Sequence, residues 1–445
     1  MGPVIVKWFY LKNTNIFHIC TMASPEEIFT PGGIPTFTYV IRDEDKYEDA
    51  LKKGLNTKGF IVSVAGPSKS GKTVLINRVI SADELIPITG AGMNNPEEIW
   101  DRVLDWMKVP TATQREIDKR FSGHLDIEAK ASAGILLAKA ETSGKMGGKA
   151  ERGTTKREQF NRRGMTQVIA DIADSSYVIF VDDFHYMERS IQAEAARQLK
   201  DAAGKGVKIC IALVKHRGDD VVRANPELRG RIRAIDFNYW SIDNLCQIAY
   251  KGFAELNLSI DESSINYFAM EAGGSPQLMQ AICLETCRHL KIEGPKDGKT
   301  PLILSKETQT EIMLATSVIT DFSSLCEVLD SGPRTRGVER KEYQFKDGQS
   351  GDVYRCVLKA MAANPPALSF TYEDLLNRLE SICQGNSPGG ASVIGTCEQM
   401  NTIARDKFPN ERVIDWDGQK SIMEVSDPYF IFYLRWSDYL KKPAR

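Results

Sequence analysis

The sequence predicts an α/β protein: a parallel sheet, then a helical region, then a small C-terminal domain of helices and a hairpin. Three observations predict this fold class. Short apolar runs alternate with helical patterns up to about residue 240, which is the order of a parallel sheet flanked by helices. Amphipathic helical patterns then follow without recognisable strands. Further helical patterns precede two alternating strands near the C-terminus.

The predicted sheet is carried by short apolar segments rich in β-branched residues, a composition typical of buried parallel strands. They are FIVSVAG (60–66), IPITG (86–90), YVIFVDDF (177–184), VKICIALV (207–214) and RIRAIDF (231–237). Helical patterns lie between them, as in KTVLINRVI, PEEIWDRVLDWM (96–107) and RSIQAEAARQLKDAAGKG.

The region after residue 240 is predicted to be helical. Each of its amphipathic segments opens with Ser or Asp, which are preferred N-cap residues. The segments are SIDNLCQIAYKGFAELN, DESSINYFAMEA and SPQLMQAICLETCRHL. The stretch SGPRTRGVERKEYQFKDGQSG (331–351) is predicted to be an exposed linker.

The C-terminal region has the order of a winged helix, that is, helices followed by a β-hairpin. The helical patterns are GDVYRCVLKAMAAN, TYEDLLNRLESIC and ASVIGTCEQMNTIARDKF. RVIDWDGQKSIMEV then reads as two alternating strands around an Asp-Gly turn. DPYFIFYLRWSDYL closes the chain as an aromatic helix.

These patterns divide the chain into four parts. They are an N-terminal segment (1–58), the sheet-forming core (59–238), a helical lid (239–330) and the winged-helix domain (331–445). Residues 1–21 are expected to be an extension, because a second start-like segment, MASPEEIF, begins at Met22.

A basic, glycine-rich insertion is predicted within the core, at about residues 129–163. From Lys139 to Arg163 there are eight Lys or Arg and three Asp or Glu, a net charge of +5. Two interpretations stay open: a flexible solvated insertion, or a loop that touches nucleic acid, a partner or the centre of a ring.

Composition excludes several classes of protein. The net charge of −2 gives no overall basic field for nucleic acid or an anionic membrane. The nine cysteines are scattered and odd in number, which suits a reducing cytoplasm better than a disulfide framework. No run of 18 apolar residues exists, so no membrane contact is expected and the predicted location is cytoplasmic.

A phosphate-binding motif follows the first predicted strand. GPSKSGKT (66–73) fits G-x-x-x-x-G-K-[ST], and strand, glycine-rich loop and helix form the context that supports this pattern. Backbone N–H groups of such a loop, together with Lys72, bind the phosphates of ATP, and the Thr73 hydroxyl suits Mg²⁺. The predicted nucleotide-binding residues are Gly66, Pro67, Ser68, Lys69, Ser70, Gly71, Lys72, Thr73 and Val74.

Paired carboxylates end the third predicted strand. Asp182 and Asp183 follow an apolar run, where two acids are costly unless a cation or water network uses them. We expect Asp182 to hold the Mg²⁺ water shell and Asp183 to orient or deprotonate the attacking water. The alternative is that both residues cap the next helix.

Basic residues after the fourth strand and before the fifth are further candidates. Lys215, His216 and Arg217 follow VKICIALV, where a basic group can reach the γ-phosphate; a solvated turn is the alternative. Arg229 and Arg231 precede the last strand, on the far side of the domain from its own loop. They are therefore expected to complete a neighbouring subunit's site, unless they are surface arginines paired with acids.

The order of these motifs resembles the AAA+/STAND group of P-loop ATPases over about residues 35–292. The resemblance implies ATP with Mg²⁺ as cofactors, a sensor after strand four, an arginine finger before strand five, and a helical lid. Pro276, in EAGGSPQLMQ (271–280), is the lid residue placed to cover the adenine or ribose.

Two departures refine the resemblance. The motif at the end of the third predicted strand reads VDD (181–183). The lid motif reads GSPQ (274–277), with Gln277 where an AAA+ sensor arginine would stand. Both are similar to the STAND branch, and the C-terminal segment resembles archaeal-type ATPases with a winged helix. Slow hydrolysis and a switch function are therefore expected.

The function predicted from these features is an ATP-binding, slowly hydrolysing switch. It is expected to form a ring or filament with nucleotide and to act through a separate effector protein; anti-phage defence in prokaryotes is suggested by the resemblance alone. The alternative is a DNA-handling ATPase of the initiator or transposition-regulator kind. DNA binding is not favoured, because ASVIGTCEQMNT, the candidate recognition helix, contains no Lys or Arg.

Overall fold

The structure, a computed structural model, forms two compact units. The first, the sheet unit, comprises Glu48–Ala65 and Asn77–Ile235; the second, the helical unit, comprises Met1–Tyr47, Gly66–Ile76 and Asp236–Arg445. The structure describes residues 23–42, 46–109, 114–115, 158–159, 164–214, 228, 230–334, 340–408 and 413–443.

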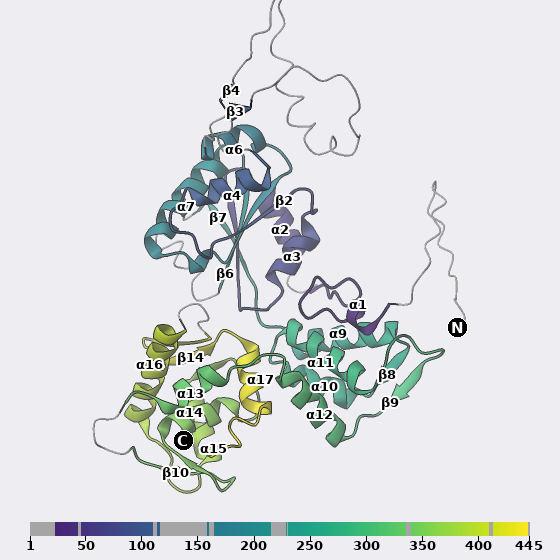
Figure 1. Cartoon of the computed structure of the whole chain (residues 1–445), viewed down its shortest axis with the longest axis vertical. Helices are drawn as coiled ribbons and strands as arrows, with labels where there is room; N and C mark the ends of the chain where they lie inside the picture. The colour runs from purple at the N-terminus through teal and green to yellow at the C-terminus, as the bar shows by residue number, and fades with distance from the viewer. Residues whose placement is uncertain are drawn as a thin grey trace, which may run out of the picture. The chain divides into compact units, whose positions relative to one another are not determined.

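The predicted α/β fold class is confirmed by a five-stranded sheet (Figure 1). Its strands are β1 (Ile61–Ala65), β2 (Leu85–Thr89), β5 (Val178–Asp182), β6 (Lys208–Leu213) and β7 (Ile232–Asp236). Their order across the sheet is β2-β5-β6-β1-β7. The pairs β1–β6, β5–β6 and β2–β5 are parallel, so the central strand β6 separates the strand before the glycine-rich loop from the strand that ends in two acids.

Helices cover the sheet because its strands are apolar on both sides. Ile179 and Ile209 share one core cluster with residues of the helices that cover this face, among them Trp100 and Leu199. The helices of this unit are α2 (Tyr47–Leu55), α4 (Glu98–Trp106), α6 (Met165–Ile172) and α7 (Arg189–Gly204), with the 3₁₀ turn η2 (Phe184–Tyr186). Helix α3 (Lys72–Val79) begins in the helical unit and ends in the sheet unit. A short antiparallel pair, β3 (Gln114–Arg115) with β4 (Glu158–Gln159), accompanies them.

Three helices of the helical lid begin where the capping residues predicted them: α9 (Ile242–Glu255), α10 (Glu262–Glu271) and α11 (Pro276–His289). The sequence did not predict α12 (Lys306–Ser317), which follows them, or α1 (Pro25–Ile28) in the N-terminal segment. Ser241, Asp261 and Ser275 each accept a backbone hydrogen bond at the start of α9, α10 and α11. The expectation that strands stop after residue 240 is wrong: β8 (Leu258–Ile260) pairs in parallel with β9 (Thr300–Leu302).

The winged-helix region contains helices and a three-stranded antiparallel sheet of order β12-β14-β13. The helices are α13 (Ser323–Ser331), α14 (Val353–Ala362), α15 (Tyr372–Ile382), α16 (Gly390–Lys407) and α17 (Pro428–Trp436). The strands are β12 (Ser369–Thr371), β13 (Ile414–Asp417) and β14 (Ile422–Val425).

The linker predicted at 331–351 is only partly a linker. β10 (Tyr343–Gln344) pairs with β11 (Ser350–Gly351), and Tyr343 and Phe345 are buried in the core of the winged-helix region. The aromatic side chains of this stretch therefore belong to the domain that follows it.

Helix α17 is shared between two hydrophobic cores. Its residues Phe430 and Leu434 belong to the winged-helix core, whereas Tyr429 and Phe432 belong to the core of the lid helices. Because the helix is apolar on more than one face, its side chains take part in the packing of both cores.

Candidate nucleotide-binding site

The loop between β1 and α3 has the backbone geometry that its glycines permit. A β-carbon on Gly66 would lie 2.4 Å from Cβ of Phe237, so no larger residue fits there. Gly71 has a φ of +97°, in the left-handed region that favours glycine. Lys69 also lies in that region, with a φ of +58°, although a non-glycine residue is disfavoured there.

The ammonium group of Lys72 is held over its own loop. Its Nζ donates to the carbonyl oxygens of Gly66 at 3.1 Å and Pro67 at 2.5 Å. The buried Ser70 donates its hydroxyl to Pro67 O at 2.8 Å. These bonds fix the loop, and they place the lysine charge beside the first turn of α3, where helix N–H groups also favour an anion. Thr73, in that turn, is exposed.

Asp182 ends strand β5, at the carboxyl edge of the sheet. Ala65, the last residue of β1, is in register with Leu213 of β6, and Val181 of β5 is in register with Ile211. Because the strands are parallel, Asp182 and Ala65 both lie at the carboxyl edge of the sheet, which is where ligands of open α/β sheets bind.

The backbone at Asp183 is strained. Asp183 has a φ of +55°, and its N–H donates to Oδ1 of Asp182 at 2.9 Å. It precedes the turn η2 but makes no side-chain capping bond, so helix capping does not account for this residue. A non-glycine residue in this conformation persists where the surroundings require it, often at functional sites.

Trp240 connects the loop to the lid. Its indole Nε1 donates to Ser70 O at 2.8 Å, and its backbone N–H donates to Gly274 O at 3.1 Å. The Cγ of Pro276 lies 4.0 Å from the position of a β-carbon on Gly71. The lid turn that carries the predicted residue Pro276 therefore lies against the phosphate-binding loop.

Arg42 is a neighbour of the site that the sequence did not reveal. Its buried guanidinium lies 5.4 Å from the ring centre of Trp240 and 4.9 Å from that of Tyr47. It also donates to Asn238 O at 3.2 Å. Arg42 thus fixes the tryptophan that contacts the loop. No residue spacing connects position 42 with position 240, so only the tertiary fold shows this pair.

Of the three predicted arginines Arg217, Arg229 and Arg231, only Arg231 lies in the described part of the chain. Its carbonyl oxygen accepts from Ile61 N at 2.9 Å, and its side chain is exposed. Ile61 begins the five-residue strand β1, so Arg231 is roughly 15 Å along the strand from the loop end at about 3.3 Å per residue. Arg217 and Arg229 lie outside the described residues, as do Lys215, His216 and most of the 129–163 insertion.

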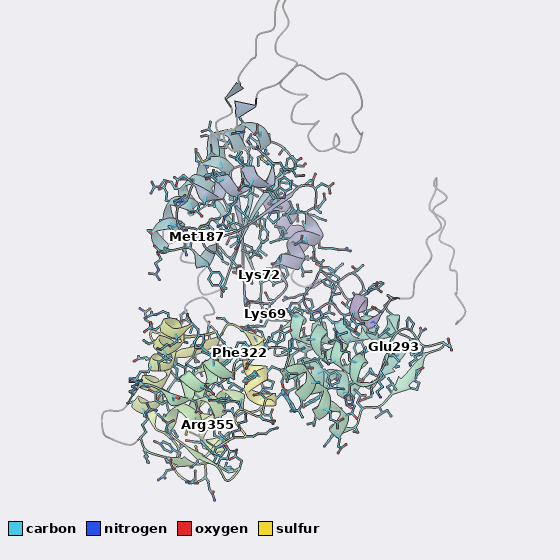
Figure 2. The ribbon with its side chains drawn as sticks, viewed as in Figure 1. Lys69, Lys72, Met187, Glu293, Phe322 and Arg355 are labelled. Carbon is cyan, nitrogen blue, oxygen red and sulfur yellow. The ribbon has the colours of Figure 1, made fainter. Side chains whose placement is uncertain are left out.

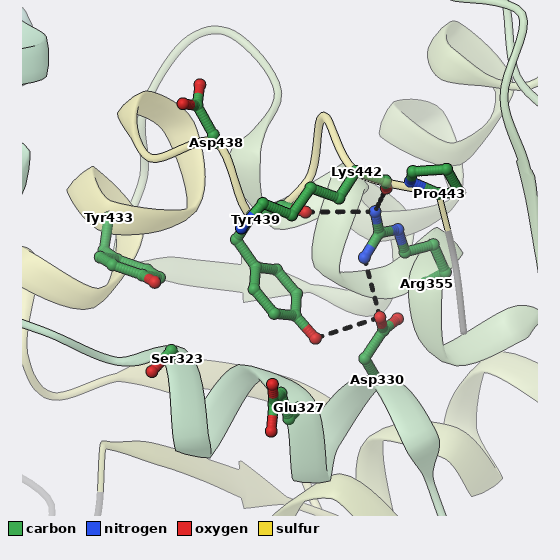
Figure 3. Close-up of a pocket in the computed structure, with 9 residues that line it drawn as sticks. All are labelled: Ser323, Glu327, Asp330, Arg355, Tyr433, Asp438, Tyr439, Lys442 and Pro443. Carbon is green, nitrogen blue, oxygen red and sulfur yellow. Dashed lines mark hydrogen bonds and ion pairs between the residues drawn. The ribbon is translucent and has the colours of Figure 1, made fainter.

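A cavity of about 170 Å³ lies in the winged-helix region (Figure 3). Buried Arg355 donates to Asp330 Oδ2 at 2.8 Å and to the carbonyl oxygens of Tyr439 and Leu440, each at 3.3 Å, and it also donates to Lys442 O. Burial raises the pKa of Asp330, against the effect of Arg355. These bonds attach the C-terminal segment to α13 and α14, which is a structural role.

The described residues contain no cluster of three His, Cys, Asp or Glu side chains that could hold a metal ion. None of their helices has the length and hydrophobicity needed to cross a bilayer.

Comparisons with known proteins find likeness in solved structures alone. The chain matches no protein-family model and no curated protein sequence. It is similar to Cdc6p from Pyrobaculum aerophilum, with 13% identity, 94% of this chain and 99% of that chain covered, and a TM-score of 0.42. A Walker-type ATPase of Pyrococcus abyssi has 13% identity, coverages of 90% and 99%, and a TM-score of 0.46.

The Orc2 protein of Aeropyrum pernix gives a third match, with 11% identity, coverages of 93% and 97%, and a TM-score of 0.43. Identities and scores of this size carry no conclusion about what this chain binds or does. Its function is therefore inferred from its own residues.

Proposed function

We propose that the chain binds ATP with Mg²⁺ at residues 66–74 and hydrolyses it slowly, as a nucleotide-controlled switch. The observation that carries the proposal is the loop itself. Gly66 leaves no room for a side chain, and Lys72 and Ser70 donate to the loop carbonyls. A constrained loop with a cation before a helix N-terminus is suited to a phosphate chain.

The donor set also fits a hydrated divalent cation. The Thr73 hydroxyl and the Asp182 carboxylate supply the hard oxygen atoms that Mg²⁺ prefers. When bound, Mg²⁺ neutralises charge on the β- and γ-phosphates. Lys72 would hold the same phosphates, and Asp183, kept in a strained conformation after Asp182, would orient the attacking water or accept its proton.

Nucleotide binding tests the proposal. Lys72→Ala should weaken binding of ATP by about 10- to 150-fold, the equivalent of losing charge-assisted hydrogen bonds worth ~1.5–3 kcal/mol. Asp182→Ala should bind ATP nearly as well but hydrolyse it far more slowly. Calorimetry and phosphate release measure the two effects, with Lys58→Ala, an exposed lysine paired with Asp174, as the matched control. Equal ATP affinities of the wild type and Lys72→Ala would contradict a nucleotide site at this loop.

Assembly through a shared site is the second part of the proposal. Arg231 lies at the amino end of β1, away from the loop of its own chain, so its target would be the site of the next subunit. Repeated head-to-tail contacts of this kind close into a ring or continue as a filament. The effector would be a separate protein. Anti-phage defence is the pathway we propose, on the resemblance of the VDD and GSPQ motifs alone.

Mixing two inactive variants tests the shared site. Arg231→Ala should hydrolyse ATP slowly but still bind it, and mixing it with Asp182→Ala should restore part of the activity. One subunit then supplies the arginine and the other an intact site. Arg197→Ala, an exposed arginine of α7, is the control. A protein that stays monomeric with ATP and shows no rescue would contradict assembly.

The candidate recognition helix, α16, does not support the DNA-handling alternative. In α16 the basic residues, Arg405 and Lys407, stand in the last turn. Because α16 has basic residues only in its last turn, it can make few phosphate contacts, and such contacts dominate DNA affinity.

A further inference from the structure

An ion pair connects the phosphate-binding loop to the first residues of α17. Nζ of Lys69 lies 2.6 Å from Oδ2 of Asp427, 358 positions along the chain. The same ammonium lies 4.4 Å from the ring centre of Tyr429. Lys69 and Lys72 are labelled together in Figure 2. The loop thus carries two lysines, of which one is bound by its own carbonyls and the other by an acid of the winged-helix region.

The backbone conformation at position 69 disfavours any residue with a side chain, so the contacts of the Lys69 side chain must offset this cost. Its φ of +58° is one that glycine adopts without strain. A glycine at this position would keep the loop shape but would lose both the ion pair and the contact with Tyr429. The strain is offset, at least in part, by these contacts.

Asp427 uses its two oxygens for two different purposes. Oδ1 accepts from Tyr429 N at 3.0 Å and so caps the start of α17. Oδ2 binds Lys69. Burial raises the pKa of the Tyr429 hydroxyl, and the charge of Asp427 adds to this effect, so the ring beside the ammonium stays neutral. One carboxylate therefore defines the first turn of α17 and fixes it to the loop.

The ion pair is accessible enough to be broken by a competing anion. The side chains of Lys69 and Asp427 retain 25% and 20% of their exposure. The triphosphate of a bound nucleotide carries several negative charges, and Lys69 is three positions from Lys72 in the same short loop. A single carboxylate competes poorly with such an anion for an ammonium group.

We propose that Asp427 and the nucleotide phosphates compete for Lys69, so that ATP binding releases the start of α17 from the loop. The proposal rests on the proposed function, and it adds the means by which nucleotide would reach the winged-helix region. Since α17 contributes side chains to both the lid core and the winged-helix core, its release would alter the packing between them. Lys69 and Asp427 are then positioning residues of the switch.

Asp427→Asn tests the competition in the full chain. Asparagine caps a helix as well as aspartate does, so this variant removes the charge and keeps the cap. ATP affinity measured by calorimetry should rise by about 2- to 5-fold, the factor that corresponds to an exposed ion pair of up to ~1 kcal/mol. Lys69→Met should lower ATP affinity, and Asp427→Asn added to Lys69→Met should bring no further gain.

Hydrogen exchange gives a second readout. In the wild type, ATP should speed amide exchange at residues 427–430, and in Asp427→Asn these amides should exchange fast without ATP. Should Asp427→Asn fail to fold, Asp427→Ser supplies an uncharged cap for the same measurements.

The outcomes separate the two proposals. Unchanged or weakened ATP affinity in Asp427→Asn, while Lys72→Ala still weakens binding as expected, would overturn the competition and leave the nucleotide site intact. Absence of ATP binding by the wild type would overturn the proposed function and the competition with it.

Discussion

The two ends of α17 are held by ion pairs that differ in solvent exposure and in their number of hydrogen bonds. At its start, Asp427 binds Lys69 of the loop with both side chains about one-fifth to one-quarter exposed. At its end, Arg435 binds Glu271 of the lid through two bonds, at 2.6 and 2.9 Å, with 8% and 5% exposure. Trp436 Nε1 donates to the same carboxylate at 2.7 Å. The first contact is partly exposed and contains one hydrogen bond beside an aromatic ring, whereas the second is buried and contains three hydrogen bonds to one carboxylate.

This difference indicates which end of α17 can respond to a ligand. A buried charge that loses its partner is left without water or counter-charge, so such a pair rarely opens. An exposed pair exchanges one set of partners for another at little cost. Helix α17 is therefore anchored to the lid and adjustable at the loop.

The largest effect is expected at the buried end. Glu271→Ala should reduce the free energy of unfolding by about 3–5 kcal/mol, because the Arg435 guanidinium and the Trp436 indole lose their shared carboxylate. Urea denaturation followed by circular dichroism measures the loss. Asp201→Ala, which breaks the surface pair with Lys205 at the end of α7, is the matched control and should cost less than ~1 kcal/mol. Similar losses in both variants would erase the contrast between the two ends.

A much smaller effect is expected at the loop end. Lys69→Met should change the free energy of unfolding by no more than ~1 kcal/mol, because Asp427 stays partly hydrated and still caps α17. The same denaturation assay applies, with Lys58→Met as the exposed-lysine control. A loss above ~2 kcal/mol would mean that the loop contact is a structural anchor, and the proposed competition would then be costly.

Local patterns predicted much of this fold. The apolar runs gave the sheet strands to within a few residues, and Ser241, Asp261 and Ser275 marked the helix starts, because both signals depend on neighbouring residues. The parallel pair β8–β9 was missed because three-residue strands carry no periodicity. Tyr343 and Phe345 were placed in a linker because the charges around them outweigh two aromatic rings.

The candidate site divides in the same way. The loop and the two aspartates were predicted from contiguous motifs. Arg42, Trp240 and Asp427 could not be predicted, since their contacts with the loop region cross up to 358 positions. Nothing in a local pattern distinguishes Asp427 from any other helix cap.

The clamp formed by Arg355 has a consequence for synthesis of the chain. The guanidinium lies early in the winged-helix region and is 2% exposed, yet three of its acceptors are carbonyl oxygens of residues 439, 440 and 442. Until residue 442 has left the ribosome, a charge destined for the interior lacks most of its partners, and burying it would be costly. We therefore expect this region to remain open until residue 442 has emerged, and to close after the earlier parts of the chain.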